Sequence, residues 1–278
     1  MKTEKLGAET TLVERGGVSL VTFPRLADPQ VLAQAVSTRL GGVSEKAYGS
    51  LNLSFKVKDE PVQVEENREL LGKALGLDLS RAVWVDQVHG EKVLRLDASN
   101  LPAGGGSLGE GDGLITQEKE VPILILVADC LPVLFYDPVH KAIGLAHAGW
   151  RGTVSHIAPK TLLAMGGAFG TKPEEVRAAL GPCIGPCCYE VGEDVRKEIT
   201  GVFPWGDEVL AKTSQDHWNL DLAEANARQL LEVGMKPENL IRSGLCTIKR
   251  IDLFYSHRAE ATGDKPTGRV GAVLMLKD

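Results

Sequence analysis

Residues 121–152 read VPILILVADCLPVLFYDPVHKAIGLAHAGWRG and contain three apolar runs, at residues 122–127, 132–136 and 142–146. The breaks between the runs, ADCL and DPVHK, are short and carry polar residues. Apolar runs of this length between such breaks are typical of buried strands. Together with residues 113–116 just upstream, they predict a dense block of strands.

Outside this block, similar patterns predict further strands and several helices. Strands are expected at residues 18–23, 35–38, 82–85, 92–96 and 270–274, and helices at residues 61–76, 152–165, 193–200 and 221–233. The strands outnumber the helices and occur in clusters rather than in strict alternation with them. This distribution favours an α+β fold with mixed or antiparallel sheets over a doubly wound parallel sheet.

Capping signals indicate where two of these helices begin and end. Asp59 is expected to cap the helix at residues 61–76, and Pro61 is tolerated in its first turn. Gly234 directly follows the helix at residues 221–233 and is expected to end it in a left-handed conformation.

Composition limits the class of protein. A chain of 278 residues with 43% hydrophobic residues can bury a large core, and its net charge of −6 argues against binding to nucleic acid. Neither a signal peptide nor a membrane span is expected, because the first residues are polar and the apolar segment 121–136 contains an aspartate and two prolines. The five cysteines lack a secreted-scaffold spacing, so reduced thiols in a cytoplasmic protein are expected.

Two histidines and one cysteine follow strand-like segments closely enough to lie at the rim of a sheet. His89 stands directly before a glycine, Cys130 follows the apolar run 121–128, and His147 follows the run 142–146. Three such ligands without a nearby fourth suggest catalytic zinc, which keeps one position for water or substrate. A buried free cysteine with two hydrogen-bonded histidines explains the same residues equally well. The gaps of 41 and 17 residues match no short zinc signature and leave both interpretations open.

Four motifs occur in order along the chain: QVHG at residues 87–90, ADC at 128–130, HAGWRG at 147–152 and GPCIGPCCYEV at 181–191. Together they resemble the bacterial polyphenol-oxidase or laccase-domain family, which is also described as purine nucleoside phosphorylases and as the peptidoglycan editing factor. The similarity extends from residues 37–44 to Gly268 and Arg269, so it covers most of the chain.

This resemblance implies a single domain over residues 1–278, with central mixed β-sheets flanked by helices. It also implies that His89, Cys130 and His147 hold the metal. Zinc is the expected ion. Copper is able to enter the same site, because it outcompetes zinc at most nitrogen and sulfur sites.

The implied activity is zinc-dependent phosphorolysis of purine nucleosides such as adenosine, inosine and methylthioadenosine, with adenosine deaminase activity beside it. The implied partners are therefore a purine nucleoside and phosphate. Three alternatives stay open. In the first, Cys130 is a nucleophile and His147 a base that hydrolyse an amide of a peptidoglycan precursor. The second is copper-dependent polyphenol oxidation, although six histidines are few for a multicopper enzyme. The third is a metal-stabilised interaction module without turnover.

Three arginines lie within family-like motifs and are candidates for contacting the phosphate or the nucleoside. Arg151 is the strongest and is assigned a catalytic role, because it stands at the expected start of a helix, whose N-terminus favours an anion. Its planar guanidinium also suits a pair of phosphate oxygens. Arg39 and Arg258 are expected to bind substrate, and each is equally explained as an ordinary surface or ion-pair arginine.

Amides and carboxylates supply the remaining candidates. Asn52 and Gln87 carry amides suited to a purine edge or a ribose, and both are expected to bind substrate. Asp112, in a Gly-Asp-Gly sequence, is expected to do the same or simply to make a turn. Asp129 is expected to act in catalysis by orienting a ligand or a substrate hydroxyl, although a loop-capping role explains it as well.

Two other motifs resemble known sites less well. The glycine-rich stretch 103–113 precedes a strand rather than a helix, so it is expected to be a mobile surface loop and not a dinucleotide site. His89-Gly90-Glu91 with Cys183 and Cys187 is similar to the zinc site of base deaminases. However, three residues separate the two cysteines here instead of two, and nearby prolines disfavour the required helix. Cys183, Cys187 and Cys188 are therefore expected in a loop near the active site.

Overall fold

The computed structural model describes residues 2–261 and 266–278 and contains strands and helices along its whole length. The strands are β1 (Lys2–Lys5), β2 (Thr11–Arg15), β3 (Val18–Thr22), β4 (Leu32–Ser37), β5 (Val83–Asp86), β6 (Val93–Leu96), β7 (Gly106–Glu110), β8 (Gly113–Thr116), β9 (Ile123–Val127), β10 (Leu131–Asp137), β11 (Ala142–Ala148), β12 (Arg177–Leu180), β13 (Glu190–Gly192), β14 (Leu210–Lys212), β15 (His217–Leu220), β16 (Leu240–Arg242) and β17 (Val270–Leu276). The α-helices are α1 (Pro61–Leu75), α2 (Trp150–Val154), α3 (Ile157–Phe169), α4 (Glu193–Val202), α5 (Leu222–Glu232) and α6 (His257–Glu260).

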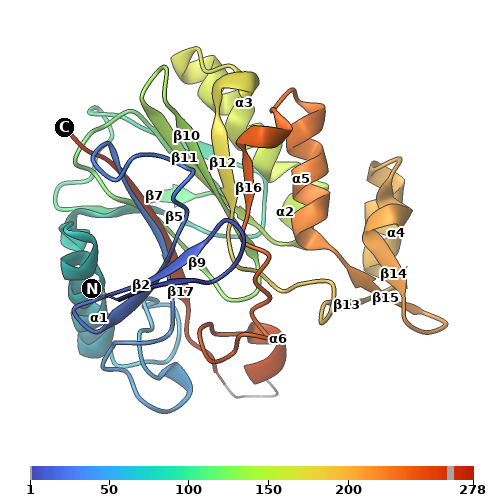
Figure 1. Ribbon diagram of the computed structural model, residues 1–278, viewed down its shortest axis with the longest axis horizontal. Coiled ribbons are helices and arrows are strands. Elements are labelled where there is room, and N and C mark those ends of the chain that lie inside the picture. The colour runs from blue at the N-terminus through green and yellow to red at the C-terminus, as the bar shows by residue number, and fades with distance from the viewer. Residues whose placement is uncertain (1, 262–265) are drawn as a thin grey trace.

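Two large sheets form the centre of the molecule (Figure 1). One has eight strands in the order β1-β2-β3-β4-β17-β9-β5-β7, and the other has six in the order β16-β12-β10-β11-β8-β6. Both are mixed, because parallel pairs such as β5–β9 and β12–β16 occur beside antiparallel ones. A third sheet, β13-β15-β14, lies with α4 on a projection at one side of the molecule. The predicted α+β domain with central mixed sheets is confirmed.

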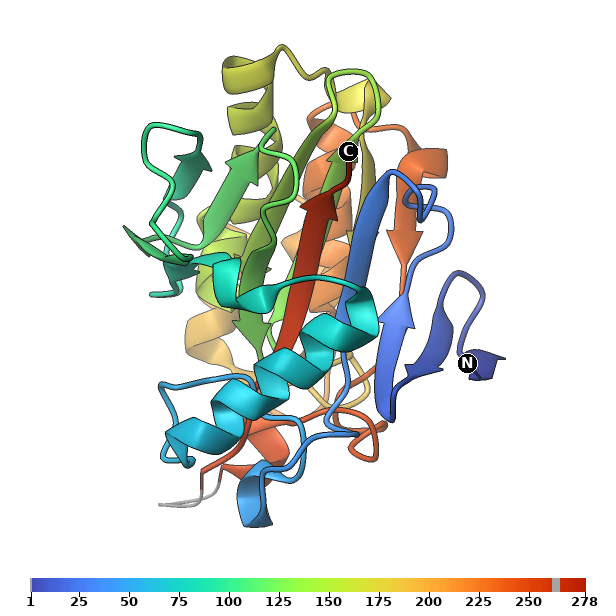
Figure 2. The same cartoon turned by 90° about the vertical axis from the view of Figure 1, so that its left-hand side faces the viewer.

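Helices cover the outer face of each large sheet. Helix α1 crosses the eight-stranded sheet on the side that faces the viewer in Figure 2, and α3 and α5 lie behind the six-stranded sheet. Each interface has its own cluster of buried hydrophobic side chains, and a third cluster fills the space between the two sheets. Both faces of the central strands are therefore buried.

This layering explains why the apolar runs are continuous. In β17, Val270, Ala272 and Leu274 point toward the six-stranded sheet, whereas Val273 packs with the residues beneath α1. A strand that is buried on both faces has no polar alternation, because successive side chains enter two different cores.

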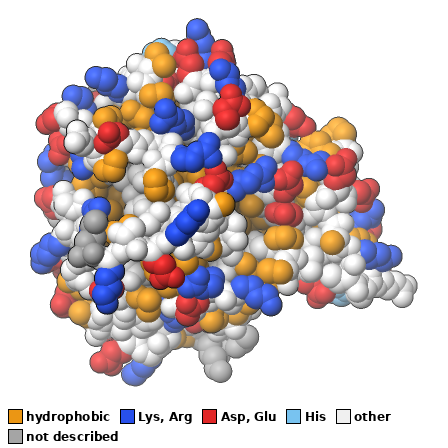
Figure 3. Space-filling view, in the orientation of Figure 1, with side chains coloured by type: hydrophobic (Ala, Val, Ile, Leu, Met, Phe, Trp, Pro, Cys, Tyr) orange, Lys and Arg blue, Asp and Glu red, His pale blue; other side chains and the backbone are white. Residues whose placement is uncertain are grey.

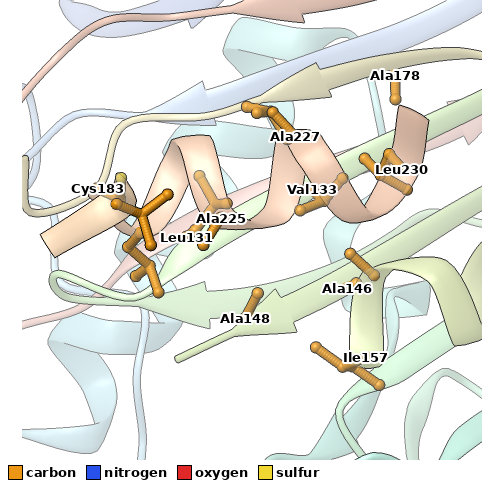
Figure 4. Close-up of a cluster of buried hydrophobic side chains, with 14 of the residues drawn as sticks. Leu131, Val133, Ala146, Ala148, Ile157, Ala178, Cys183, Ala225, Ala227 and Leu230 are labelled. Atoms are coloured by element: carbon orange, nitrogen blue, oxygen red, sulfur yellow. The ribbon is translucent and has the colours of Figure 1, made fainter. Parts of the chain in front are cut away.

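Small side chains bring α5 and α3 close to the six-stranded sheet. Figure 4 shows α5, which carries Ala225 and Ala227, packed along Leu131 and Val133 of β10, with Ala146 and Ala148 of β11 nearby. Alanine in these positions lets the helix backbone approach the sheet closely, since a packed core leaves few voids.

The first three helices correct the sequence-based expectations in two places. The helix predicted at residues 152–165 is two helices, α2 and α3, because His156 adopts a left-handed conformation with φ of 61° between them. Asp59 does not cap α1. Glu60 occupies the cap position without a side-chain hydrogen bond, and Asp59 instead accepts hydrogen bonds from Ser44 and Asn52. Pro61 does begin α1, as predicted.

The glycine-rich stretch is also different from the expectation. Residues 106–110 form β7, an edge strand that pairs in parallel with β5, so the prediction of a mobile surface loop is wrong for this part. Gly105, with φ of 83°, lies so close to the backbone of Arg81 and Ala82 that a side chain would not fit. Gly105 thus permits a close backbone contact. Gly234 ends α5 with φ of 97°, as predicted.

The surface carries charges of both signs. On the face shown in Figure 3, basic and acidic side chains are interspersed. In the described ranges 2–261 and 266–278, we find no helix with the length and apolar character needed to cross a membrane.

Candidate metal centre

His89, Cys130 and His147 converge from three parts of the fold. His89 follows β5, Cys130 lies between β9 and β10, and His147 is near the end of β11. One donor atom from each residue lies within 4.8 Å of the other two. The Cys130 Sγ and His89 Nε2 atoms are 3.8 Å apart, and the two imidazole rings meet edge to face with centroids 4.8 Å apart.

This donor set fits a divalent metal of the zinc type. Zinc bonds of ~2.0–2.3 Å to nitrogen and sulfur in a tetrahedral arrangement place neighbouring donors roughly 3.3–3.7 Å apart. The observed 3.8 Å between sulfur and nitrogen needs only a small contraction. Gly149 makes room for the cluster, since a Cβ atom there would lie 3.0 Å from both Cys130 Sγ and His89 Cδ2. These three residues would therefore hold the ion and leave a fourth position open.

Asp112 orients two of the three candidate ligands. Its buried carboxylate accepts hydrogen bonds from the backbone N–H groups of Val88, His89 and Gly90, and from Nδ1 of His147 at 2.8 Å. The backbone bonds hold His89 in a left-handed conformation with φ of 60°. The bond to Nδ1 leaves Nε2 of His147 to face the cluster, which is the usual arrangement for a metal-binding histidine. Asp112, predicted to bind substrate or make a turn, thus lies behind the ligands.

Replacing Asp112 with asparagine is expected to weaken metal binding by about tenfold, because an outer-shell partner of a ligand is lost. An amide cannot accept hydrogen bonds on both of its ends, so either His147 or the turn at residues 88–90 loses its partner. Metal affinity measured by competition with a chelator tests this.

Asp137→Asn is the matched control, because the buried Asp137 holds the Val139–His140 turn and Nδ1 of His140 in the same way. That variant should lose stability but keep its metal affinity. Equal metal affinities of the two variants would contradict the role of Asp112.

Asp129 is anchored by the segment that precedes β17. Its carboxylate accepts hydrogen bonds from Thr247 Oγ1, from Ser256 Oγ at 3.0 Å and from the backbone N–H of Arg258 at 2.7 Å. Its φ of 81° is unusual for a residue other than glycine. Such strained conformations persist only where neighbours hold them. Asp129 therefore determines the direction in which the chain enters Cys130.

Charge interactions within the cluster shift two pKa values. Burial by itself raises the pKa of Cys130, but the neighbouring His147 and His89 lower it by more, so that the pKa is about 6. Burial by itself lowers the pKa of His147, but Cys130 and Asp112 raise it, to about 9. The Cys130 thiolate and the His147 imidazolium thus stabilise each other, because a nearby opposite charge favours the ionised form of each group.

The cluster lies in a pocket of about 750 Å³. Pockets for small molecules have volumes of ~300–1,000 Å³. The lining includes four large aromatic side chains and three arginines: Phe55, Trp84, Trp150, Tyr189, Arg68, Arg258 and Arg269. Aromatic faces and guanidinium groups together suit a planar ring joined to an anion.

Two of these arginines are half-buried cations for which the described residues provide no acidic partner. Within the residues that the structure describes, neither Arg68 nor Arg269 forms an ion pair. Arg68 donates to the Leu53 carbonyl and lies over the ring of Trp84, while Arg269 donates to the carbonyls of Thr267 and Gly268. Burial lowers the pKa of Arg68 to about 10 and also lowers the pKa of Arg269. An anion bound in the pocket would offset the free-energy cost of burying these two positive charges.

The other residues singled out in the sequence are divided between the pocket and the surrounding structure. Gln87 lines the pocket, but its amide both donates to and accepts from the backbone of Leu126. Arg258 also lines it and donates to the Glu190 carbonyl.

Besides Asp112, three of the expected residues do not line the pocket. Arg39 pairs with Glu260 at 2.9 Å, and Asn52 is fully buried with its amide bonded to neighbours that include the Arg269 backbone. Arg151 is exposed and lies over the Trp150 ring, 4.2 Å from its centroid. Neither Arg68 nor Arg269 was given a role from the sequence. Arg68 lies in no distinctive motif, and Arg269 marked only the end of the family resemblance.

The deaminase-type cysteine pair does not form. Cys183 is buried in the core beside Leu131 (Figure 4), whereas Cys187 lies with Cys188 and Cys246. Ile184 and Tyr189 from the same loop line the pocket, so the loop is close to the metal centre, as expected.

Fold and site together define a class of α+β protein in which two facing mixed sheets carry a pocket with a candidate His₂Cys metal centre. The family model described as "Multi-copper polyphenol oxidoreductase laccase" matches residues 33–277, and the chain belongs to this family. The family description implies a bound metal.

Curated relatives and a solved structure agree with this membership. The chain is 40% identical to "Purine nucleoside phosphorylase" of Deinococcus radiodurans over 260 residues, which is 94% of each chain. It is 34% identical to "Purine nucleoside phosphorylase YlmD" of Bacillus subtilis over 246 residues, which is 87% of each chain. The crystal structure of YlmD from Geobacillus stearothermophilus superimposes with a TM-score of 0.87 at 32% identity, and the match covers 96% of this chain and 98% of that one.

Proposed function

We propose that the protein is a zinc-dependent purine nucleoside phosphorylase that uses His89, Cys130 and His147 as metal ligands. The observation that carries the proposal is the presence of this donor cluster in one pocket with two half-buried arginines that lack ion-pair partners among the described residues. Phosphorolysis needs both a cation for phosphate and a group that activates oxygen. The relatives named purine nucleoside phosphorylases support the same activity.

The chain's own residues supply binding and orientation. Trp84 and Tyr189 offer aromatic faces for the purine, and Arg68 and Arg269 offer guanidinium groups for phosphate. When bound, zinc would supply Lewis-acid polarisation of an oxygen atom. Asp112 keeps His147 in the required tautomer by accepting a hydrogen bond from its Nδ1–H group.

Asp129 and Arg151 receive different roles from those first expected. We propose that Asp129 is a positioning residue, since its carboxylate is occupied by Thr247, Ser256 and the Arg258 backbone. Arg151 does not line the pocket, so its role in phosphate binding stays a prediction. Arg269 does line the pocket and is better placed to bind phosphate.

A nucleoside panel tests the proposal. Purified zinc-loaded protein is incubated with inosine or adenosine, with and without phosphate, and the products are separated by chromatography. We expect free base and ribose 1-phosphate only when phosphate is present. Conversion of adenosine to inosine without phosphate would reveal the proposed accompanying deamination. Base release that does not depend on phosphate, or full turnover by metal-free protein, would contradict the proposal.

The family description favours copper-dependent phenol oxidation as a second candidate. Copper binds the same nitrogen and sulfur donors. Apart from the His89 cluster, however, the described ranges 2–261 and 266–278 contain one other group of three close donors, and all three are cysteines. A cluster of imidazoles for further copper ions is therefore missing from these ranges. Oxygen uptake by copper-loaded protein with a phenol tests this candidate.

A further inference from the structure

Cys187, Cys188 and Cys246 bring three thiol groups together at a second place in the fold. Their sulfur atoms lie within 4.8 Å of one another, and those of Cys187 and Cys188 are 3.5 Å apart. Cys246 is buried, Cys188 is partly buried and Cys187 is exposed, so the group opens to the surface on one side. None of the three belongs to the His89 cluster.

The thiol cluster forms where two distant segments run side by side. The loop after β12 and the segment after β16 descend together in Figure 1. They are joined by backbone hydrogen bonds from Cys183 to Leu245 and from Thr247 to Cys183. Cys246 and Cys187 therefore face each other because the fold pairs these segments, not because the cysteines are close in sequence.

Gly185 shapes this cluster in two ways. Its backbone N–H donates to Cys246 Sγ at 3.3 Å, which favours the thiolate. A Cβ atom on Gly185 would lie 3.1 Å from Cys246 Cβ and 3.7 Å from Cys187 Sγ. The absence of a side chain therefore lets the backbone approach the sulfur atoms closely.

The three sulfur atoms compete for negative charge. Burial, together with the neighbouring Cys187 and Cys246, raises the pKa of Cys188 to about 12. Burial also tends to raise the pKa of Cys246, but backbone N–H groups, including those of Lys249 and Gly185, lower it overall. One thiolate is thus stabilised by the backbone, whereas a second or third needs a cation among the sulfur atoms.

We propose that Cys187, Cys188 and Cys246 form a separate binding site for one soft, thiophilic cation of the Cu(I) type. Thiolate ligands select soft ions such as Cu(I). The His89 cluster mixes nitrogen and sulfur donors, whereas this cluster offers sulfur atoms alone and therefore favours the softer ion. Binding releases the thiol protons to solvent and changes no oxidation state. Ile184 and Tyr189, which flank Cys187 and Cys188 in the same loop, line the pocket. A bound ion would therefore also stabilise the conformation of this part of the pocket lining.

The test uses the full-length Cys130→Ser chain, so that the His89 cluster lacks its thiol. Protein reduced with a phosphine is titrated anaerobically with Cu(I) in competition with a coloured chelator. We expect one Cu(I) per chain, with only sulfur neighbours in its X-ray absorption spectrum. Adding Cys187→Ser should weaken binding by more than the ~10–100-fold typical of an outer-shell loss. Cys187 is exposed, so this change should leave folding intact, which circular dichroism verifies.

Cys183→Ser in the same background is the matched control. Cys183 lies in the same loop, but its side chain is buried in the hydrophobic core and is not part of the thiol cluster. This variant should keep one equivalent of Cu(I). The proposal is overturned if the Cys130→Ser chain takes up no Cu(I) against the chelator, if Cys187→Ser binds as tightly as its parent, or if Cys183→Ser loses the ion to the same extent.

Discussion

Cys130→Ala is expected to empty the proposed zinc site and to reduce the proposed nucleoside cleavage by about a thousandfold or more. Cys130 provides the one thiolate of the cluster, and two neutral imidazoles alone hold a metal weakly. A Lewis-acid metal stabilises a transition state by several kcal/mol, and each ~1.36 kcal/mol corresponds to a tenfold change in rate. Elemental analysis and kcat measured on the same preparation test both effects.

Cys183→Ala serves as the control, because Cys183 is also a buried cysteine but lies in the hydrophobic core. It should lose some stability and keep its zinc and its activity. The reverse result, zinc lost with Cys183→Ala and retained with Cys130→Ala, would support the deaminase-type arrangement instead. Turnover that survives complete zinc loss in wild-type protein would point to Cys130 as a nucleophile.

The second large effect concerns phosphate. Arg269→Met is expected to lower kcat/KM for phosphate by about 10- to 100-fold, because a charge-assisted hydrogen bond of ~1.5–3 kcal/mol is lost. Methionine keeps much of the side-chain volume but removes the charge. Zinc content should not change. Initial rates at varied phosphate concentration, with saturating inosine, give the result.

Arg151→Ala distinguishes the structural interpretation from the sequence-based one. If phosphate binds at Arg269, the phosphate dependence should change far more in Arg269→Met than in Arg151→Ala. The opposite ranking would mean that Arg151, and not the pocket arginines, binds the anion. Equal losses of phosphorolysis and of phosphate-independent deamination in Arg269→Met would indicate general damage to the pocket.

Long or doubly buried elements were predictable from the sequence, and short ones were not. The runs that form β9, β10 and β11 are apolar throughout, since both faces of each strand are buried. By contrast, β7 is a glycine-containing edge strand without any apolar pattern. It is recognisable as a strand only from its pairing with β5 in the structure. The break at His156 was missed, although Pro159 marks it: a proline is tolerated in the first turn of α3 but not in the interior of a helix that begins at residue 152.

The candidate site was predictable only in part. The rim positions of His89, Cys130 and His147 follow from the strands that precede them, but their convergence came from the family resemblance. Residue type alone did not show that Asp112 supports the ligands instead of contacting substrate, since that depends on what surrounds its carboxylate. Arg68 lies on α1, far along the chain from Arg269, so their shared pocket exists only in three dimensions.

The position of β17 has a consequence for how the protein is made. This strand, the last in the described chain, lies between β4 and β9 in the middle of the eight-stranded sheet. A ribosome synthesises residues 32–37 and 123–127 long before residues 270–276 emerge. Until then, β4 and β9 each expose an unpaired edge of the kind that promotes aggregation. We therefore expect these two edges to be the part of the nascent chain most prone to aggregation until its central strand is available.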